Sequence, residues 1–407
     1  MSAGGRIGLV VRPLFLPPVN LQELALQTAA DFTRTFGREP KWIAAAPGRV
    51  NIIGEHTDYN DGFVFPMAIE RYTVIAAAPN DLPRITLRSS SGQGVAVIDL
   101  GLPLKPAPKG AWANYPMGVI AGFLARKIVP AGFDALMNST VPLGGGLSSS
   151  ASLEVATATL LEAVTGRTLD PVEKALLCQK AEHDFAGMPC GIMDQFISVL
   201  GRKDHVLLLD CRSRQTELVP FTDATMAVLI VNTNVRHELT GSEYPTRRRQ
   251  CETAARALGV PSLRDASAGL LEQNRGKLED VVYRRARHVI GEIARTPRAA
   301  AAIRQRDWAQ AGEAMYASHY SLKDDYEVSC PELDAVVEIA RSIGPSGGVS
   351  GCRMTGGGFG GCAVALVKTD AVDAVMATLE SRYKAKTGIT PTLFVSRPGQ
   401  GATVLRA

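Results

Sequence analysis

Hydrophobic residues along the chain are spaced as in alternating helices and strands. Apolar positions recur every three to four residues over 21–36, which predicts a helix, and short apolar runs broken by turns between residues 42 and 100 predict strands. The same criteria predict helices over 112–127, 148–165 and 170–185, and strands over 133–140, 206–210 and 226–232. Pro171, directly after Asp170, favours a helix start there because its fixed φ suits the first helical position.

The second half of the chain follows a different pattern. Residues 244–341 have mostly helical spacing, and 352–367 predict strand-like structure around a glycine loop, followed by a helix and a final strand. A length of 407 residues exceeds what one hydrophobic core usually organises. We therefore predict two domains, residues 1–215 and 216–407.

The charge balance limits the class of partner. Hydrophobic residues make up 46% and charged residues 21% of the chain, as in ordinary globular proteins. Lys and Arg total 44 against 40 Asp and Glu, so the net charge is only +4. That is too small for a generally basic surface, so we expect no nucleic acid partner and only local binding of anions. The basic run over 247–249 lies on a helical stretch and is interpreted as a solvated face.

Cysteine usage and apolar runs bear on localisation. The seven cysteines are odd in number and lack the C-x-x-C spacing of zinc or redox sites, which fits a reducing cytosol. An apolar stretch over 9–16 is interrupted by Arg12 and Pro13, so no signal peptide is indicated. No apolar run reaches the roughly 18 residues needed to span a bilayer. We expect a cytoplasmic protein without a membrane partner.

The segment LGGGLSSSAS over 143–152 has the composition of a phosphate-binding loop. Three glycines let backbone N–H groups approach an anion, the following helix N-terminus offers unsatisfied donors, and serine hydroxyls can reach phosphate oxygens or Mg²⁺. A turn with a serine N-cap is the structural alternative, although three glycines exceed what a cap requires. Because no Lys follows the glycines, as it would in a P-loop, we expect Mg²⁺ and basic residues elsewhere to neutralise the phosphates.

A second glycine loop, TGGGFGG over 355–361, matches the spacing G-x-G-x-x-G. We do not interpret it as a dinucleotide site, because the strand-like CAVALV over 362–367 follows it and the helix that would hold a pyrophosphate is missing. A protein kinase is also excluded, since no H-R-D or D-F-G motif is present.

Two clusters of polar residues are candidates for substrate chemistry. Arg49, Glu55, His56 and Asp58 fall within the segment PGRVNIIGEHTDYN and could orient a polyol through hydrogen bonds, with a metal site or a capped turn as alternatives. Glu182 and Asp194 flank a glycine-rich segment. One of these two carboxylates could hold Mg²⁺ while the other accepts the proton of an attacking hydroxyl, as in phosphoryl transfer.

Together these motifs resemble those of galactokinases, within the family that also contains homoserine, mevalonate and phosphomevalonate kinases. Three segments carry the resemblance in the family's order: GRVNIIGEHTDYNDG over 48–62, VPLGGGLSSSAS over 141–152 and RMTGGGFGGC over 353–362. Further similar stretches are CGIMDQF over 190–196, NVRHELTGSEYPTRRRQC over 234–251 and SLKDDYEVSCPELD over 321–334.

The resemblance implies an α+β fold with an N-terminal sugar- and ATP-binding domain and a C-terminal ferredoxin-like α+β domain, with the active site between them. It implies transfer of the γ-phosphate of ATP to the anomeric hydroxyl of galactose, giving galactose 1-phosphate and ADP in the first committed step of galactose catabolism. Galactose and ATP are the expected partners and Mg²⁺ the expected cofactor, and we expect a monomer.

By position, the resemblance also implies roles for single residues. The residues around the sugar would be Arg49, Glu55, His56, Asp58, Asp194 and Tyr244. Among these, Asp194 would be the catalytic base, with Arg49 as the second catalytic group. The residues at ATP would be Gly144, Gly145, Gly146, Leu147, Ser148, Ser149 and Ser150, with Trp112 bordering the adenine. Ser150 and Glu182 would reach Mg²⁺.

Two relatives of different function are the alternatives. An N-acetylgalactosamine kinase is less similar, because its counterparts of HTDYN, MDQF and GGGFGG typically differ from the segments in this chain. A catalytically silent, galactokinase-like sugar sensor can lack residues of the serine loop. Here the loop over 148–152 is complete, which favours an enzyme.

Overall fold

The structure, a computed structural model, describes residues 20–92, 94–236 and 240–407. The apolar stretch predicted not to be a signal peptide, residues 9–16, lies outside these ranges. Among the helices that the structure describes, none is both long and apolar enough to cross a membrane.

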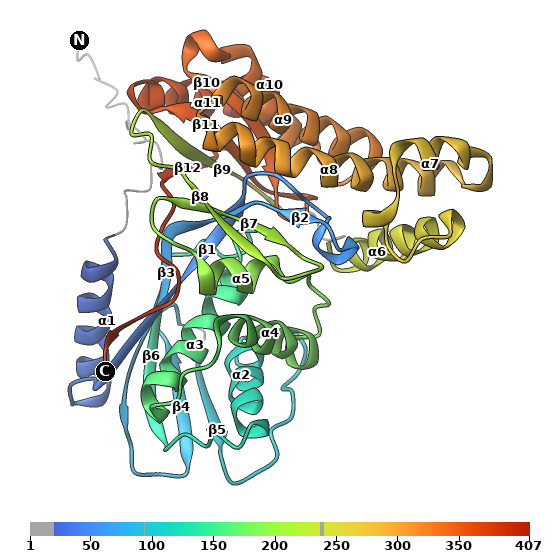
Figure 1. Cartoon of the computed structure of the whole chain (residues 1–407). Helices are drawn as coiled ribbons and strands as arrows, with labels where there is room; N and C mark the ends of the chain where they lie inside the picture. Colours follow the sequence, from blue (N-terminus) through green and yellow to red (C-terminus); the bar gives the residue numbers. More distant parts are fainter. Residues whose placement is uncertain (1–19, 93, 237–239) are drawn as a thin grey trace, which may run out of the picture.

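A six-stranded sheet forms the base of the N-terminal half, with strand order β13-β1-β3-β6-β4-β5 (Figure 1). Its strands are β1 (Trp42–Asn51), β3 (Pro66–Pro79), β4 (Arg84–Ser89), β5 (Val95–Asp99), β6 (Phe133–Ser139) and β13 (Thr403–Arg406). Successive residues of β1 point to opposite faces of the sheet. Ile43 and Ala45 pack against α1 (Leu21–Phe36), whereas Trp42, Ala44 and Ala46 join a core with helices on the other face. Those helices include α2 (Asn114–Ala125), α3 (Ser149–Thr165) and α4 (Pro171–Ala181).

A four-stranded antiparallel sheet, β10-β11-β9-β12, forms the base of the C-terminal half. Its strands are β9 (Met226–Arg236), β10 (Val349–Thr355), β11 (Gly360–Lys368) and β12 (Thr392–Ser396). The helices of this half are α6 (Thr240–Leu258), α7 (Ala268–Gln273), α8 (Asp280–Arg304), α9 (Trp308–Tyr320), α10 (Pro331–Ile343) and α11 (Val372–Thr387). Leu229 and Val231 of β9 face a core that includes α6, α8, α10 and α11. Val228 and Ile230, on the other face of this sheet, join a second core that also contains Val50 of β1, so this face packs against the N-terminal half.

A small sheet of β2 (Phe63–Val64), β7 (His205–Asp210) and β8 (Thr216–Pro220) lies between the two larger ones (Figure 1). Strand β8 comes after the predicted domain boundary but pairs with β7 before it, and β13 returns from the far end of the chain to pair with β1. The division at residue 216 therefore stays a prediction.

Most of the predicted elements are present, with some differences. The helix predicted over 112–127 spans 114–125, and the single final strand is replaced by two, β12 and β13. The interpretation of the basic run as a solvated face is wrong for Arg247, which is buried. Its guanidinium pairs with Glu243 and donates to the carbonyl oxygens of Tyr326 and Glu327, so packing against this neighbouring segment takes it out of solvent.

Candidate active site

The phosphate-loop candidate connects β6 to the N-terminus of α3. Gly144 and Gly146 have φ of 74° and 71°, a backbone region that glycine enters at little cost. Ser148 also has a positive φ of 60°, and its hydroxyl donates to Asp194 Oδ2 at 2.5 Å instead of capping the helix. The loop lines a cavity of about 440 Å³ together with residues 357–361 of the second glycine loop. Backbone donors at a helix N-terminus thus face a space in which an anion fits.

The second glycine loop packs against the first. A Cβ atom at Gly356 would lie 3.2 Å from the Gly146 oxygen, and one at Gly361 would lie 3.1 Å from the Gly145 oxygen. A side chain at either position would push the two loops apart. The glycines of 355–361 therefore allow the two loops to approach closely, and β11 follows them as the predicted strand.

Trp112 lies beyond the serines of the phosphate loop. It lines a separate cavity of about 290 Å³ with Tyr115, Leu143, Ser149 and Ser150. Because Ser149 and Ser150 also line the phosphate-loop cavity, the two spaces are adjacent. This is a suitable place for a base and ribose, and the role of Trp112 at adenine stays a prediction.

Arg49 and Asp194 form a bidentate ion pair. Arg49, at the end of β1, donates from Nε to Asp194 Oδ1 at 2.9 Å and from Nη2 to Oδ2 at 2.8 Å. The remaining guanidinium nitrogen, Nη1, donates to the Gly146 oxygen of the phosphate loop. Asp194 sits in the first turn of α5 (Met193–Leu200). A planar guanidinium fork fixes both oxygens of a carboxylate, so the position of Asp194 is set by β1 and the phosphate loop together.

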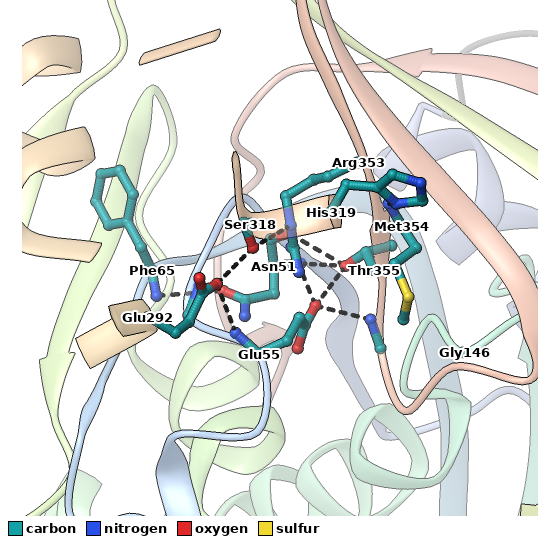
Figure 2. Close-up of polar contacts among 12 residues, drawn as sticks. Asn51, Glu55, Phe65, Gly146, Glu292, Ser318, His319, Arg353, Met354 and Thr355 are labelled. Carbon is teal, nitrogen blue, oxygen red and sulfur yellow. Dashed lines mark hydrogen bonds and ion pairs between the residues drawn. The ribbon is translucent and has the colours of Figure 1, made fainter. Parts of the chain in front are cut away.

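A third cavity, the sugar-side cavity of about 180 Å³, contains the sugar-side candidates. All six predicted sugar contacts line it: Arg49, Glu55, His56, Asp58, Asp194 and Tyr244. Glu55 is buried, and its Oε1 accepts from Arg353 and from Thr355 Oγ1 at 3.1 Å (Figure 2). The same oxygen accepts from the Gly356 N–H at 2.8 Å. The Glu55 carboxylate is therefore held by the strand and loop of the C-terminal half.

His56 and Asp58 have strongly shifted pKa values. Burial, followed by the charges of His288 and Arg247, lowers the pKa of His56 to about 3, so its imidazole is neutral at pH 7. Its Nδ1 lies 2.8 Å from the Tyr59 hydroxyl. Burial, followed by the charges of Asp194 and Glu55, raises the pKa of Asp58 to about 7. The cavity thus presents a neutral imidazole and a carboxyl of raised pKa, and both can form hydrogen bonds with the hydroxyls of a neutral polyol.

Glu182 lines both the sugar-side cavity and the phosphate-loop cavity, and it is hydrogen-bonded to Ser150, which lines the phosphate-loop cavity. Burial, and then the charge of Asp194, raise the pKa of Glu182 to about 7, while hydrogen bonds from Ser150, Cys190 and Gln195 oppose that rise. In the part of the chain that the structure describes, no three His, Cys, Asp or Glu side chains are grouped as a metal site. One carboxylate and one hydroxyl still fit Mg²⁺, which proteins commonly hold through one or two carboxylates with substrate phosphates and water.

Comparison with known proteins identifies the family. A model of the galactokinase galactose-binding signature matches residues 30–79, and models of the N-terminal and C-terminal domains of GHMP kinases match 114–202 and 299–385. The galactokinases of Homo sapiens and Bos taurus are each 50% identical over 389 residues, covering 94% of this chain and 97% of each relative. The chain belongs to the galactokinase family. The predicted family and the predicted class of enzyme, an ATP-dependent sugar kinase, are thereby confirmed.

Solved structures agree with this assignment. A Lactococcus lactis galactokinase, solved in complex with galactose, is 35% identical, with a TM-score of 0.88 and coverage of 94% of this chain and 99% of that one. The mevalonate kinase of Methanococcus jannaschii, 20% identical with a TM-score of 0.63 over 88% of this chain and 98% of that one, shares the fold. The predicted α+β fold class is confirmed.

Several residues that hydrogen-bond to the site residues were not predicted from the sequence motifs. Arg353 and Thr355, at the start of the segment RMTGGGFGGC, donate to the Glu55 carboxylate. Gln195 bridges Glu182 and the buried Glu154, with Nε2 at 2.7 Å and 3.0 Å from their Oε2 atoms. Gln195 follows Asp194 directly, so its position in the motif MDQF could have identified it as a residue of the site.

Proposed function

We propose that this chain transfers the γ-phosphate of ATP to the anomeric hydroxyl of galactose, giving galactose 1-phosphate and ADP. The observation that carries the proposal is that Arg49, Glu182 and Asp194 line both the sugar-side cavity and the phosphate-loop cavity. A hydroxyl bound in the sugar-side cavity can therefore meet a phosphate bound in the phosphate-loop cavity. We also place the protein in the cytoplasm and expect it to act as a monomer.

In this proposal each group has a defined task. Asp194 accepts the proton of the anomeric hydroxyl as that oxygen attacks, and Arg49 orients the carboxylate and stabilises charge on the transferring group. Neutral His56 donates to or accepts from a sugar hydroxyl, while Glu55 and Asp58 accept from others. The backbone N–H groups of the glycine loop and the hydroxyls of Ser149 and Ser150 hold phosphate oxygens. Mg²⁺ held by Ser150 and Glu182 would supply positive charge beside the β- and γ-phosphates.

The substrate assignment is tested by ATP turnover with galactose, N-acetylgalactosamine, glucose, mevalonate and homoserine in parallel, with the phosphorylated position located by NMR. We expect turnover with galactose and phosphate on its anomeric oxygen. Preference for N-acetylgalactosamine would overturn the specificity. Tight galactose binding without turnover of any sugar would support the sensor alternative.

A glycine next to Asp58 allows a specific test of the sugar-side cavity. A Cβ atom at Gly191 would lie 1.6 Å from Asp58 Oδ2, so Gly191→Ala must displace that carboxylate. Because the hydrogen bond between Asp58 and a sugar hydroxyl would be lost, we expect the galactose KM to rise about tenfold, with the ATP KM nearly unchanged.

Gly276→Ala is the matched control for this substitution. No atom lies within 4 Å of a Cβ built at Gly276, so the same added methyl should leave both KM values as they are. Steady-state kinetics of the two variants measure the KM values for galactose and ATP. An unchanged galactose KM in Gly191→Ala would remove Asp58 from the sugar contacts.

A further inference from the structure

A buried glutamate on α8, Glu292, binds the backbone of the loop that carries Glu55, His56 and Asp58, which we call the sugar-side loop. The side chain is fully buried, and its Oε1 accepts from the Gly54 N–H at 2.9 Å and the Glu55 N–H at 3.3 Å (Figure 2). The same oxygen accepts from Ser318 Oγ on α9 at 2.6 Å. Arg295, one turn further along α8, pairs with the other oxygen. Glu292 thus connects two helices to a loop that lies 238 residues earlier in the sequence.

The backbone of this loop needs such support. Gly54 has a φ of 99°, and His56 has a positive φ of 63° although it carries a side chain. A residue with a side chain in that region costs on the order of 1–3 kcal/mol and persists only where its surroundings enforce it. The buried N–H groups of Gly54 and Glu55 also need acceptors, and a carboxylate is a stronger acceptor than a carbonyl.

Charges around Glu292 keep it in the carboxylate form. Burial alone would raise its pKa, but Arg295, His288 and Arg353 lower the pKa to about 2. Glu292 therefore remains ionised throughout the pH range in which the protein would be assayed.

A second chain of contacts runs from Glu292 to the side chain of Glu55. Ser318 Oγ, which donates to Glu292, accepts from Arg353 Nε at 3.2 Å. Arg353 Nη1 in turn donates to Glu55 Oε1 at 3.2 Å and to the Asn51 oxygen at 3.0 Å. Glu55 is therefore held at its backbone by Glu292 and at its carboxylate by Arg353, and Ser318 joins the two.

We propose that Glu292 is a positioning residue for galactose binding: it fixes the backbone at Gly54 and Glu55 so that Glu55, His56 and Asp58 face the sugar-side cavity. This inference rests on the proposed function. Among the described residues, those that line the cavity do not include Glu292, so it acts through the loop and makes no contact with substrate.

The test is Glu292→Gln, which keeps the shape but replaces the charged acceptor by an amide. We expect the galactose KM to rise about tenfold because charge-assisted hydrogen bonds to the loop are weakened. The ATP KM should stay nearly unchanged, since the phosphate loop is held by other contacts. Hydrogen–deuterium exchange should become faster at the Gly54 and Glu55 amides.

Glu162→Gln provides the matched control. Glu162 is also buried on a helix, accepts from a backbone N–H, that of Leu169, at 2.8 Å, and pairs with Lys174 Nζ at 2.5 Å, but it lies at the far end of α3 from the phosphate loop. The same substitution there should lower the melting temperature and leave the galactose KM unchanged. A purely structural role for Glu292 would give that same result.

A second variant covers the case in which Glu292→Gln does not fold. Ser318→Ala removes the hydroxyl between Glu292 and Arg353 and should raise the galactose KM by a smaller factor, again without changing the ATP KM. Equal changes in both KM values, or unchanged exchange at Gly54 and Glu55, would overturn the inference. If the unaltered protein failed to phosphorylate galactose, the proposed function would fall, whereas exchange at the two amides would still decide whether Glu292 holds the loop.

Discussion

Asp194→Asn is expected to lower turnover by about 10²- to 10⁴-fold, the usual contribution of a general base, while galactose still binds. Asn keeps the size of the side chain but cannot accept the proton of the attacking hydroxyl. Its amide nitrogen also cannot accept from Arg49 and Ser148, both of which donate to Oδ2 of the carboxylate. Single-turnover kinetics and galactose titration measure the two quantities separately.

Asp134→Asn is the matched control for the charge and shape change. Asp134 on β6 accepts from Arg38 Nη2 at 2.7 Å and from Asn80 Nδ2 at 3.0 Å, so it is also a partly buried aspartate paired with an arginine. Among the described residues that line the sugar-side and phosphate-loop cavities, Asp134 is absent. Its replacement should therefore leave turnover unchanged. Near-normal turnover in Asp194→Asn would exclude Asp194 as base and as orienting group.

Arg49→Lys separates proton removal from electrostatic positioning. Lysine keeps the positive charge but lacks the planar fork that contacts both Asp194 oxygens. If phosphoryl transfer is so loose that positioning outweighs proton removal, Arg49→Lys should lose as much turnover as Asp194→Asn. A much smaller loss of turnover in Arg49→Lys would mean that proton removal by Asp194 contributes more to the rate than positioning by Arg49.

The parts of the site that could be predicted from sequence are those whose residues are close together in the chain. Glu55, His56 and Asp58 lie within four positions, and a turn of that length must place them near one another. The phosphate loop could be predicted because glycines before a helix have a local physical meaning. Helix α1 matches its predicted bounds because its apolar spacing is also a local feature, and in the structure Asn20 caps its first turn.

The supporting contacts could not be predicted in this way. Arg353 and Glu55 are 298 residues apart, and Glu292 looks from its sequence like any acidic residue of an amphipathic helix. Glu292 is buried because α8 packs on the loop at 54–56, and the local sequence around Glu292 does not encode that packing. The same reason explains the wrong interpretation of Arg247, since the two carbonyl oxygens that accept from its guanidinium lie 79 and 80 residues away in the sequence.

Glu182→Gln is expected to lower turnover by at least about 10- to 100-fold, since even outer partners of metal ligands have effects of that size. The amide would be a poorer ligand for Mg²⁺ than the carboxylate, so phosphate placement should suffer while galactose affinity stays nearly intact. Ser150→Ala should act in the same direction. Raising the Mg²⁺ concentration should rescue both variants in part, as measured by turnover at saturating ATP and galactose.

Glu154→Gln is the control that distinguishes a metal ligand from a member of a polar network. Glu154 is fully buried and shares Gln195 with Glu182, each carboxyl accepting from the same Nε2. Burial, followed by the charge of Glu182, holds the pKa of Glu154 well above its ordinary value. Among the described residues that line the sugar-side and phosphate-loop cavities, Glu154 is absent, so replacing it by an amide should change turnover little. Equal losses in Glu154→Gln and Glu182→Gln, without rescue by Mg²⁺, would mean that Glu182 belongs to the hydrogen-bond network around Gln195 and that the metal is held elsewhere.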